Sequence, residues 1–442
     1  MKNLLMHFVP TTLKVAAFAF MASHANFCIS QTQSPNELRV LTANSRTVQV
    51  KDGNQLVLND WTLDPTIELD TYYSARSDEQ RTITFTSDVD SIQFDVEPDR
   101  EYDFVIRLQD GGACKTRIST KLRSFTRPSS VAPLKPLTIP ISIERGKLHI
   151  KGKVNQSEAL DLIFDTGADT CVMYPSSISK GVKLTFTGTV ANAGTGGTIV
   201  RKVSDGNQLT IADATWHHES FLYVEKQADH ADGIVGFSVF SNRIVEMDYD
   251  RMVMIIHESL PAHAVHFSET ALTYSGSLPA VDVLMTSGDF SCNGPFILDT
   301  AGTSCMMVNQ AFGNQHDLHG KLRKVGNGTA RGVGSKSIRL SQLMLPGLTI
   351  AGQTLRDVPI HVEVPANGNQ AAPGGVICMD VLSRFNTILD FPNKRAYFQP
   401  NTHFTEPFKV RSRAYGVLIS LMLSSGLLIA IAAVFFRTRI RR

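Results

Sequence analysis

Apolar and polar residues alternate with a period of two through long parts of this chain, which is the pattern of strands with one buried face. The clearest example comes early and consists of three successive runs: Ile83 and Phe85, then Ile92, Phe94 and Val96, then Tyr102, Phe104 and Ile106. Turn-forming residues interrupt the alternation at 51–54 and at 110–112. The pattern predicts a small all-β domain over residues 26–127, built as a β-sandwich.

The two ends of the chain carry continuous apolar runs instead. Residues 1–25 combine basic residues with a short apolar stretch at 15–22 and a small-x-small ending, which is typical of a secretory signal peptide. The run 414–436 has no charged residue and is long enough to cross a bilayer, so it predicts a transmembrane helix. Basic residues flank this run on both sides, and the signal peptide therefore decides its orientation.

This orientation predicts a single-pass membrane protein whose N-terminal body is periplasmic or extracellular. The basic tail 437–442 would then remain in the cytoplasm. A sorting tag that is later removed is an alternative for the C-terminal run, because such tags also join an apolar helix to a basic end.

Between these ends, one stretch of sequence occurs twice. Asp165-Thr166-Gly167-Ala168-Asp169-Thr170-Cys171 returns as Asp299-Thr300-Ala301-Gly302-Thr303-Ser304-Cys305, and three apolar residues precede each copy. A buried strand that ends in Asp-Thr-Gly delivers a carboxylate into a tight turn, where backbone N–H groups can reach it.

The similarity continues downstream of both copies. Residues 232–241 align without a gap with 374–383, and residues 246–250 align with 388–392. The repeat predicts two homologous lobes. We place them at 137–262 and 263–403, after a Pro-rich linker at 128–136.

These paired motifs, together with the closing Asp390-Phe391-Pro392 strand, resemble those of the aspartic peptidases, in particular the bacterial retropepsin-like proteins. The resemblance covers roughly residues 135 to 400. It implies an all-β fold with two β-barrel lobes of the aspartic-peptidase type, preceded here by the β-sandwich and followed by one transmembrane helix. It also implies that Asp165 and Asp299 meet as a catalytic dyad, supported by four residues of their loops: Thr166, Gly167, Thr300 and Ala301.

The expected chemistry follows from two neighbouring carboxylates. At about 3 Å they repel by roughly 5 kcal/mol at an effective dielectric near 20, so they share one proton near neutral pH. The ionised partner can take a proton from a water molecule while the protonated partner donates to the peptide carbonyl. The chain is therefore predicted to be an aspartic-type endopeptidase that acts on extended peptide or protein substrates and needs no metal or other cofactor.

Glycine-rich turns in both lobes are candidates for flaps over a substrate. The residues concerned are Gly194, Gly196 and Gly197 in the first lobe and Gly332 and Gly334 in the second. A hairpin at this place would exclude water from a bound peptide. An ordinary glycine-rich turn is the alternative for each.

Two residues of the second lobe depart from the glycine pattern. Ala301 stands where the first lobe has Gly167, and Cys378 stands where it has Gly236. Because each adds a Cβ beside the catalytic loop, an inactive aspartic-peptidase-like protein that binds peptides or acts as a scaffold is the alternative function. Ala168 and Gly302 also lack a hydroxyl donor, so we expect activity at mildly acidic or neutral rather than strongly acidic pH.

Charge balance and residue placement argue against nucleic-acid binding and against a metal site. The formal net charge of +2, from 43 basic and 41 acidic residues, gives no sign of nucleic-acid binding. His217 and His218 are adjacent on a predicted strand and so point to opposite faces, which disfavours a metal site there. Six cysteines are present, and Cys292 with Cys378 is a conceivable disulfide within the second lobe.

Overall fold

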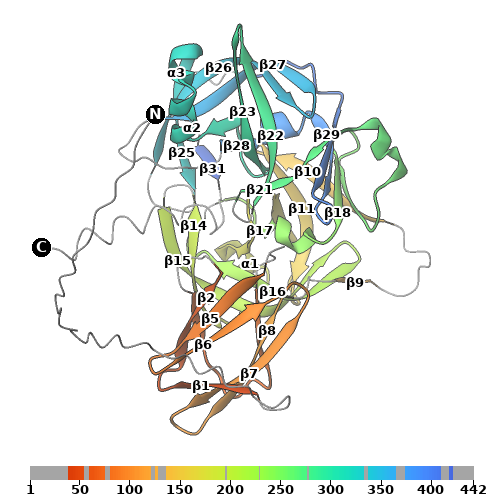
Figure 1. Cartoon of the computed structure of the whole chain (residues 1–442). Helices are drawn as coiled ribbons and strands as arrows, with labels where there is room; N and C mark the ends of the chain where they lie inside the picture. Colours follow the sequence, from red (N-terminus) through yellow and green to blue (C-terminus); the bar gives the residue numbers. More distant parts are fainter. Residues whose placement is uncertain are drawn as a thin grey trace, which may run out of the picture. The chain divides into compact units, whose positions relative to one another are not determined.

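The computed structural model of the chain describes residues 38–53, 59–74, 80–120, 125–127, 136–194, 197–227, 229–275, 278–332, 337–364, 374–409 and 418–421. Within these residues the structure is mostly β, and the helices are short (Figure 1).

The N-terminal strands form two sheets around one apolar core. Their bounds are β1 (Arg39–Ala43), β2 (Thr47–Asp52), β3 (Asn59–Thr62), β4 (Asp70–Tyr73), β5 (Arg81–Thr86), β6 (Ser91–Val96), β7 (Glu101–Leu108) and β8 (Ala113–Ser119). One sheet has the order β1-β7-β8-β4, and in the other β3, β2, β5 and β6 pair in that order. Every second residue of β6 is buried, and the rings of Phe85 and Phe104 meet with their centroids 4.9 Å apart. The period-two pattern of the sequence therefore faces inward.

Residues 137–262, called the first half below, contain a set of strands that lead to and from Asp165. They are β10 (Leu137–Glu144), β11 (Lys147–Val154), β12 (Leu160–Asp165), β13 (Cys171–Met173), β14 (Gly188–Gly194), β15 (Gly197–Ile211), β16 (Ala214–Tyr223), β17 (Gly233–Gly236), β18 (Ile244–Asp248) and β19 (Val253–His257). Two short helical segments accompany them, α1 (Pro175–Ser179) and η1 (Phe237–Phe240), and a third, η2 (Ala262–His266), lies at the boundary between the halves.

Residues 263–403, the second half, repeat this arrangement. The strands are β20 (Ser268–Ala271), β21 (Thr273–Ser275), β22 (Leu278–Ser287), β23 (Phe290–Asp299), β24 (Met306–Val308), β25 (Arg323–Gly332), β26 (Ile338–Ile350), β27 (Gln353–Glu363), β28 (Gly375–Cys378), β29 (Phe385–Asp390) and β30 (Arg395–Pro400). The helices are α2 (Gln310–Gln315), α3 (Leu318–Lys321) and α4 (Met379–Leu382).

The pairings of the two halves correspond strand for strand. In the first half β12 pairs parallel with β17, β13 pairs parallel with β16, and β15 pairs antiparallel with β11 and β16. In the second half β23 pairs parallel with β28, β24 pairs parallel with β27, and β26 pairs antiparallel with β22 and β27. The repeated sequence thus builds the same local topology twice.

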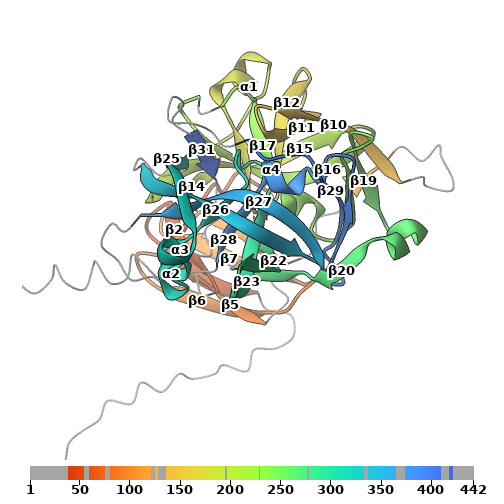
Figure 2. The same cartoon turned by 90° about the horizontal axis from the view of Figure 1, so that it is seen from above.

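One sheet joins the two halves. Its strands pair in the order β10, β19, β18, β29, β30 and β20, and its central pair, β18 with β29, takes one strand from each half. β19, β20 and β29 lie together on the right of Figure 2. Each half supplies three strands to this sheet, and buried residues of both halves belong to one apolar core.

The N-terminal strands extend the sheet of the first half. β3 pairs antiparallel with β14, with Trp61 opposite Gly188. A second short strand, β9 (Phe125–Thr126), pairs antiparallel with β16. Both contacts are made by backbone groups at strand edges.

The C-terminal apolar run differs from the sequence expectation where the structure describes it. Leu418–Leu421 forms a strand, β31, whose backbone pairs parallel with β25, rather than a turn of helix. Among the residues that the structure describes, no helix has the length and apolar character needed to cross a membrane. The rest of 414–436, the signal peptide 1–25, the tail 437–442 and linker residues 128–135 lie outside the described residues.

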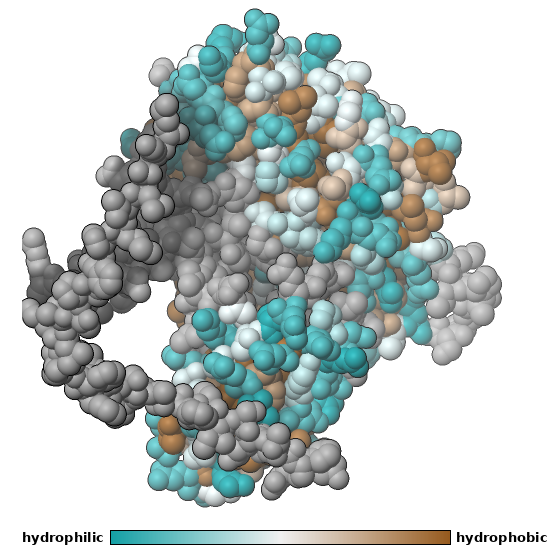
Figure 3. Space-filling view, viewed as in Figure 1, coloured by the Kyte–Doolittle hydropathy of each residue, from teal (hydrophilic) through white to brown (hydrophobic). Residues whose placement is uncertain are grey.

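Exposed apolar side chains are spread over the surface. Val265 and Val200 are the most exposed large apolar residues described, at 80% and 65%. On the face shown in Figure 3 hydrophobic residues are interspersed with hydrophilic ones.

Candidate active site

Asp165 and Asp299 occupy equivalent strand ends. Asp165 is the last residue of β12 and lies opposite Gly236 in the parallel neighbour β17. Asp299 is the last residue of β23 and lies opposite Cys378 in β28. Both side chains are fully buried. The carboxyls are also close together, because a Cβ placed on Gly167 would lie 3.0 Å from Asp299 Cγ and 3.1 Å from Asp165 Oδ1.

Backbone N–H groups of the turn hold each carboxylate. The N–H of Gly167 donates to Asp165 Oδ1 at 2.8 Å. Asp299 Oδ1 accepts two such bonds, from Ala301 at 2.9 Å and from Gly302 at 2.7 Å. The Oδ2 atoms of both aspartates are buried and have no hydrogen-bond partner outside the pair among the described residues. These two oxygens are the acceptors that remain for a reacting group.

Two threonines join the loops across the halves. The N–H of Thr166 donates to Thr300 Oγ1 at 3.0 Å, and the N–H of Thr300 donates to Thr166 Oγ1 at 3.2 Å. Each hydroxyl then donates to a carbonyl of the opposite strand at 2.7 Å, Thr166 to Leu298 and Thr300 to Phe164. Both threonines are fully buried. Four reciprocal hydrogen bonds therefore fix the two aspartate loops against each other.

Burial is the main influence on the protonation of the pair. It raises the pKa of Asp165 well above its usual range, and the charge of Asp299 raises it further. Burial also raises the pKa of Asp299 to about 7, against the N–H groups of Ala301 and Gly302, which lower it. Lys147 lowers the pKa of both carboxyls. The two groups titrate as one system that retains a proton near neutral pH.

The second loop accommodates Ala301 without backbone strain. Ala301 is not among the described residues with positive φ, and Gly167 at the equivalent position also lacks one. The Ala301 side chain is 4% exposed and packs in a cluster with Ile163 and Ala168 of the first half. The alanine therefore fills a contact between the halves.

Cys378 is matched by a second exchange in the same loop. In the first half a Cβ on Gly236 would lie 2.7 Å from the Ala168 carbonyl oxygen, so glycine is required there. In the second half the bulk is on Cys378, and Gly302, the equivalent of Ala168, gives it room: a Cβ on Gly302 would lie 2.5 Å from Cys378 Sγ. The two halves thus place the small residue on opposite sides of the same contact.

The flap candidates lie at the tips of two equivalent hairpins. Gly194 ends β14 and pairs with Gly197 at the start of β15, and Gly196 lies outside the described residues. Gly332 ends β25, the strand that pairs with β26, and Gly334 lies outside the described residues.

Lys147 and Asp229, which no sequence pattern indicates, form an ion pair close to the aspartate loops. Lys147 begins β11 and Asp229 lies between β16 and β17. Neither residue belongs to a repeated motif, and a lysine beside a glycine turn is a common surface pattern. Only their burial, at 8% and 12% side-chain exposure, sets them apart.

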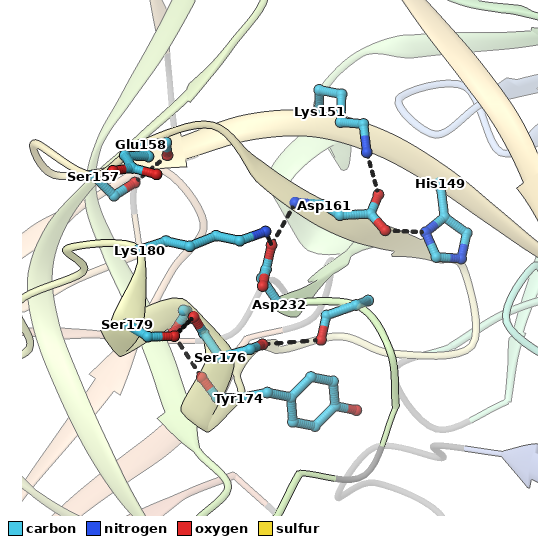
Figure 4. A network of polar contacts seen from close by, with 12 residues as sticks. His149, Lys151, Ser157, Glu158, Asp161, Tyr174, Ser176, Ser179, Lys180 and Asp232 are labelled. Carbon is cyan, nitrogen blue, oxygen red and sulfur yellow. Dashed lines mark hydrogen bonds and ion pairs between the residues drawn. The ribbon is translucent and has the colours of Figure 1, made fainter.

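A polar network on β11 and β12 contains a group of potential metal ligands. One ligand atom each of Glu144, His149 and Asp161 lies within 4.8 Å of the others. Asp161 is already engaged, since its Oδ2 lies 3.1 Å from His149 Nδ1 and its Oδ1 accepts from Lys151 at 2.9 Å (Figure 4). An ammonium on the carboxylate competes with a cation, so the donor set does not favour a metal.

Trp216 and His217 both make structural contacts. Trp216 is a core residue whose indole N–H donates to the Val239 carbonyl at 3.1 Å, and His217 Nε2 lies 3.1 Å from Thr126 Oγ1. The conceivable disulfide between Cys292 and Cys378 is wrong. Neither residue forms a disulfide: Cys292 lies in β23 opposite Met285 of β22, whereas Cys378 packs on the aspartate loop against Gly302. The described cysteines are all buried: Cys114, Cys171, Cys292, Cys305 and Cys378.

Comparisons with known proteins point to one family for part of the chain. Residues 150–239, from β11 to η1 and including Asp165, match the model of the aspartyl protease family. Among solved structures, an aspartic proteinase from Irpex lacteus is similar at 15% identity, with 62% of this chain and 99% of that chain covered and a TM-score of 0.44. A search of curated proteins gave no match.

Proposed function

We propose that the protein is an aspartic endopeptidase that hydrolyses peptide bonds with a water molecule activated by Asp165 and Asp299. The observation that carries this proposal is the pair of buried carboxyls on two equivalent loops, each with its Oδ1 held by backbone N–H groups and its Oδ2 free of partners outside the pair. The family match of residues 150–239 supports the same chemistry for the first half.

The proposed reaction needs one proton on the pair. The ionised carboxylate takes a proton from the attacking water, and the protonated carboxyl donates its proton to the carbonyl oxygen of the scissile bond. In the breakdown of the tetrahedral intermediate the C–N bond breaks and the amine leaving group takes a proton from the protonated carboxyl. A hydroxyl of the intermediate gives its proton to the ionised carboxylate as the product acid forms, so the pair stays singly protonated. Since burial raises the pKa of both groups, and that of Asp299 to about 7, we expect the singly protonated pair near neutral rather than at strongly acidic pH.

The substrate would be an extended peptide. Two hairpins, β14–β15 and β25–β26, end in glycines in equivalent places, and we propose that they cover the peptide and exclude water. Backbone pairing of an added strand would supply affinity, and side-chain pockets would supply specificity.

We further propose that the enzyme acts outside the cytoplasm while attached to a membrane. This rests on the signal-like residues 1–25 and the uncharged run 414–436 of the sequence. Fractionation of cells into membrane and soluble parts, followed by protease treatment of intact cells, tests it. Recovery of the full chain from the soluble cytoplasmic fraction would contradict it.

A non-catalytic peptide-binding protein is the second candidate, because Ala301 and Cys378 replace glycines. Both residues are accommodated, however, by φ in the first case and by Gly302 in the second. The aspartates of both halves keep their backbone donors, so the exchanges leave the reacting groups in place.

The experiment is hydrolysis of an unfolded protein by the full chain in detergent between pH 3 and pH 8. Asp165→Asn and Asp299→Asn keep size but remove the shared proton site, and Asp282→Asn, at an exposed position of β22, is the matched control. We expect activity in the wild type and in the control and a loss of more than about 1,000-fold in each of the other two variants. Equal activity in all four folded proteins, or none, would reject the enzyme.

A further inference from the structure

A buried ion pair lies next to the two aspartate loops. The Lys147 ammonium contacts the Asp229 carboxylate, and the two side chains are only 8% and 12% exposed. Pairs this well buried are uncommon, because each charge gives up its hydration. A lysine that serves only solubility would extend into solvent, so the burial of Lys147 calls for a local explanation.

The backbone on both sides of Lys147 contacts the loop of Asp299. The N–H of Leu148 donates to the Thr300 carbonyl at 3.1 Å. A Cβ on Gly146 would lie 3.6 Å from Thr303 Cβ. The turn that carries Lys147 belongs to the first half, so it packs across the boundary onto the second loop.

Lys147 acts on both aspartates from this position. Burial raises the pKa of Asp165 and of Asp299, and Lys147 opposes that rise in each. Asp229 holds the ammonium: although burial raises the pKa of Asp229, the charge and hydrogen bond of Lys147 lower it, so Asp229 is ionised.

The other titratable groups near the pair are either uncharged or act on a neighbour of the pair rather than on both aspartates. Tyr174 is buried, and burial raises its pKa, as do the charges of Asp229 and Asp165. Burial and the charge of Asp299 raise the pKa of the Cys378 thiol. Arg201 of β15 acts on Tyr174, and His149 acts on Asp229. Lys147 is therefore the basic residue whose charge reaches both members of the pair.

We propose that Lys147 is a positioning residue of the aspartate pair: its ammonium, held in place by Asp229, sets the pH range in which the pair carries a single proton. This inference rests on the proposed function. Lys147 does not itself touch the reacting atoms. It provides a fixed positive charge that stabilises the ionised carboxylate of the pair, so the singly protonated state extends to lower pH than burial and mutual repulsion alone would allow.

The test compares charge-removing and charge-keeping variants of the full chain. Lys147→Met removes the ammonium, Lys147→Arg keeps the positive charge, and Asp229→Asn removes the opposing negative charge. Lys180→Met is the matched control, because Lys180 also forms an ion pair with a buried aspartate of the first half, Asp232, at 2.6 Å. The readouts are the pH profile of kcat/KM and, independently of catalysis, the pH dependence of Tm.

We expect the pH profile to shift in opposite directions when the two residues of the ion pair are replaced in turn. Lys147→Met should move both limbs of the pH profile upward by about 0.5 to 1 pH unit, and Asp229→Asn should move them downward. Lys147→Arg should restore most of the wild-type profile, and Lys180→Met should leave it unmoved. A purely structural role for Lys147 would lower activity equally at all pH values, and that result would overturn the inference.

The Tm measurement separates this inference from the proposed function. Because Lys147 also lowers the pKa of Asp229, the comparison is made in the Asp229→Asn background. There the effect of Lys147→Met on the pH dependence of Tm should disappear when Asp165 and Asp299 are both replaced by Asn. If the wild type hydrolyses nothing but this coupling is present, the proposed function fails and the electrostatic role stands. If the wild type is active and the coupling is absent, the role of Lys147 is wrong. If Lys147→Met does not fold by itself, Lys147→Met/Asp229→Asn, which leaves no unpaired buried charge, is compared with Asp229→Asn, and loss of the ammonium should again move both limbs upward.

Discussion

The two aspartate loops follow equivalent strands and make equivalent threonine hydrogen bonds, but their side chains pack differently. In the first loop Ala168 carries the Cβ, and its partner Gly236 has none and no room for one. In the second loop Cys378 carries the bulk, and Gly302 leaves room for the sulfur. The two loops therefore fill this contact differently: backbone atoms exclude a Cβ at residue 236, whereas Gly302 leaves room for the Cys378 side chain.

The packing of the second loop explains why it lacks two of the glycines of the first. Taken one at a time, Ala301 and Cys378 suggest a second loop that has lost constraint. Taken with Gly302, which leaves room for its side chain, the cysteine is accommodated, and Ala301 contributes to a cluster that reaches Ile163 and Ala168. Such close fitting is what a well-packed interior requires.

The loops also differ in the donors that they offer. Asp165 Oδ1 accepts one backbone N–H and Asp299 Oδ1 accepts two. Since hydrogen bonds to a carboxylate favour its ionised form, the difference favours the negative charge on Asp299 and the shared proton on Asp165. The two halves are thus symmetric in topology and unequal in electrostatics.

Among substitutions that change packing or hydrogen bonds, the largest expected effect comes from giving the first loop the residue of the second. Gly236→Cys places a Cβ within 2.7 to 2.9 Å of backbone atoms of Ala168 and Thr170, and should lower the free energy of unfolding by about 3 kcal/mol. Adding Ala168→Gly should recover little of that loss, because the crowding atoms belong to the backbone. Urea unfolding monitored by fluorescence measures both. Full recovery in the double variant would show that the Ala168 methyl, and not the backbone, excludes the cysteine.

Breaking the threonine bonds should have the next largest effect. Thr300→Val keeps the shape but leaves the Thr166 N–H and the Phe164 carbonyl without partners, at a cost of about 2 to 3 kcal/mol. Thr166→Val should cost the same, because its bonds are the reciprocal set. Chemical denaturation compares the two, with Thr170→Val, at a partly exposed position, as the control. A clear inequality between Thr166→Val and Thr300→Val would break the symmetry inferred here.

The buried pair should make stability depend on pH. Its pKa is raised on folding, so the folded state binds protons more tightly, and stability is greatest at low pH and falls as pH rises from about 4 through about 7. The fall should amount to about 1.4 kcal/mol for each unit of pKa shift. Tm measured from pH 4 to pH 8 should fall less in Asp165→Asn/Asp299→Asn than in the wild type. Parallel curves would contradict the raised pKa.

The smallest effect is expected at Ala301. Ala301→Gly restores the family's glycine but removes a buried methyl and adds backbone freedom, so it should destabilise the protein by about 1 kcal/mol. We expect little change in kcat/KM, since the N–H of residue 301 still donates to Asp299 Oδ1. A large gain in activity would mean that the alanine displaces Asp299 in the native loop.

Local pattern was enough to find the strands and the two strand ends that carry Asp165 and Asp299. Alternation marks the strands of the N-terminal sheets, and the repeated Asp-Thr motif marks the ends of β12 and β23. These are short-range properties, because the period of a strand and the tolerance of glycine in a turn depend on neighbouring residues. The same reasoning located the hairpins that carry the candidate flap glycines.

What the sequence could not supply are relations between residues far apart in the chain. The reciprocal bonds of Thr166 and Thr300 span 134 residues, and the pair Lys147 and Asp229 spans 82. The free state of Cys292 and Cys378 and the pairing of β3 with β14 are of the same kind. The sequence by itself determined two equivalent aspartate-bearing turns. Only the tertiary structure decided how they face each other, how their side chains pack and which buried cation lies beside them, because packing and burial depend on contacts that no local pattern encodes.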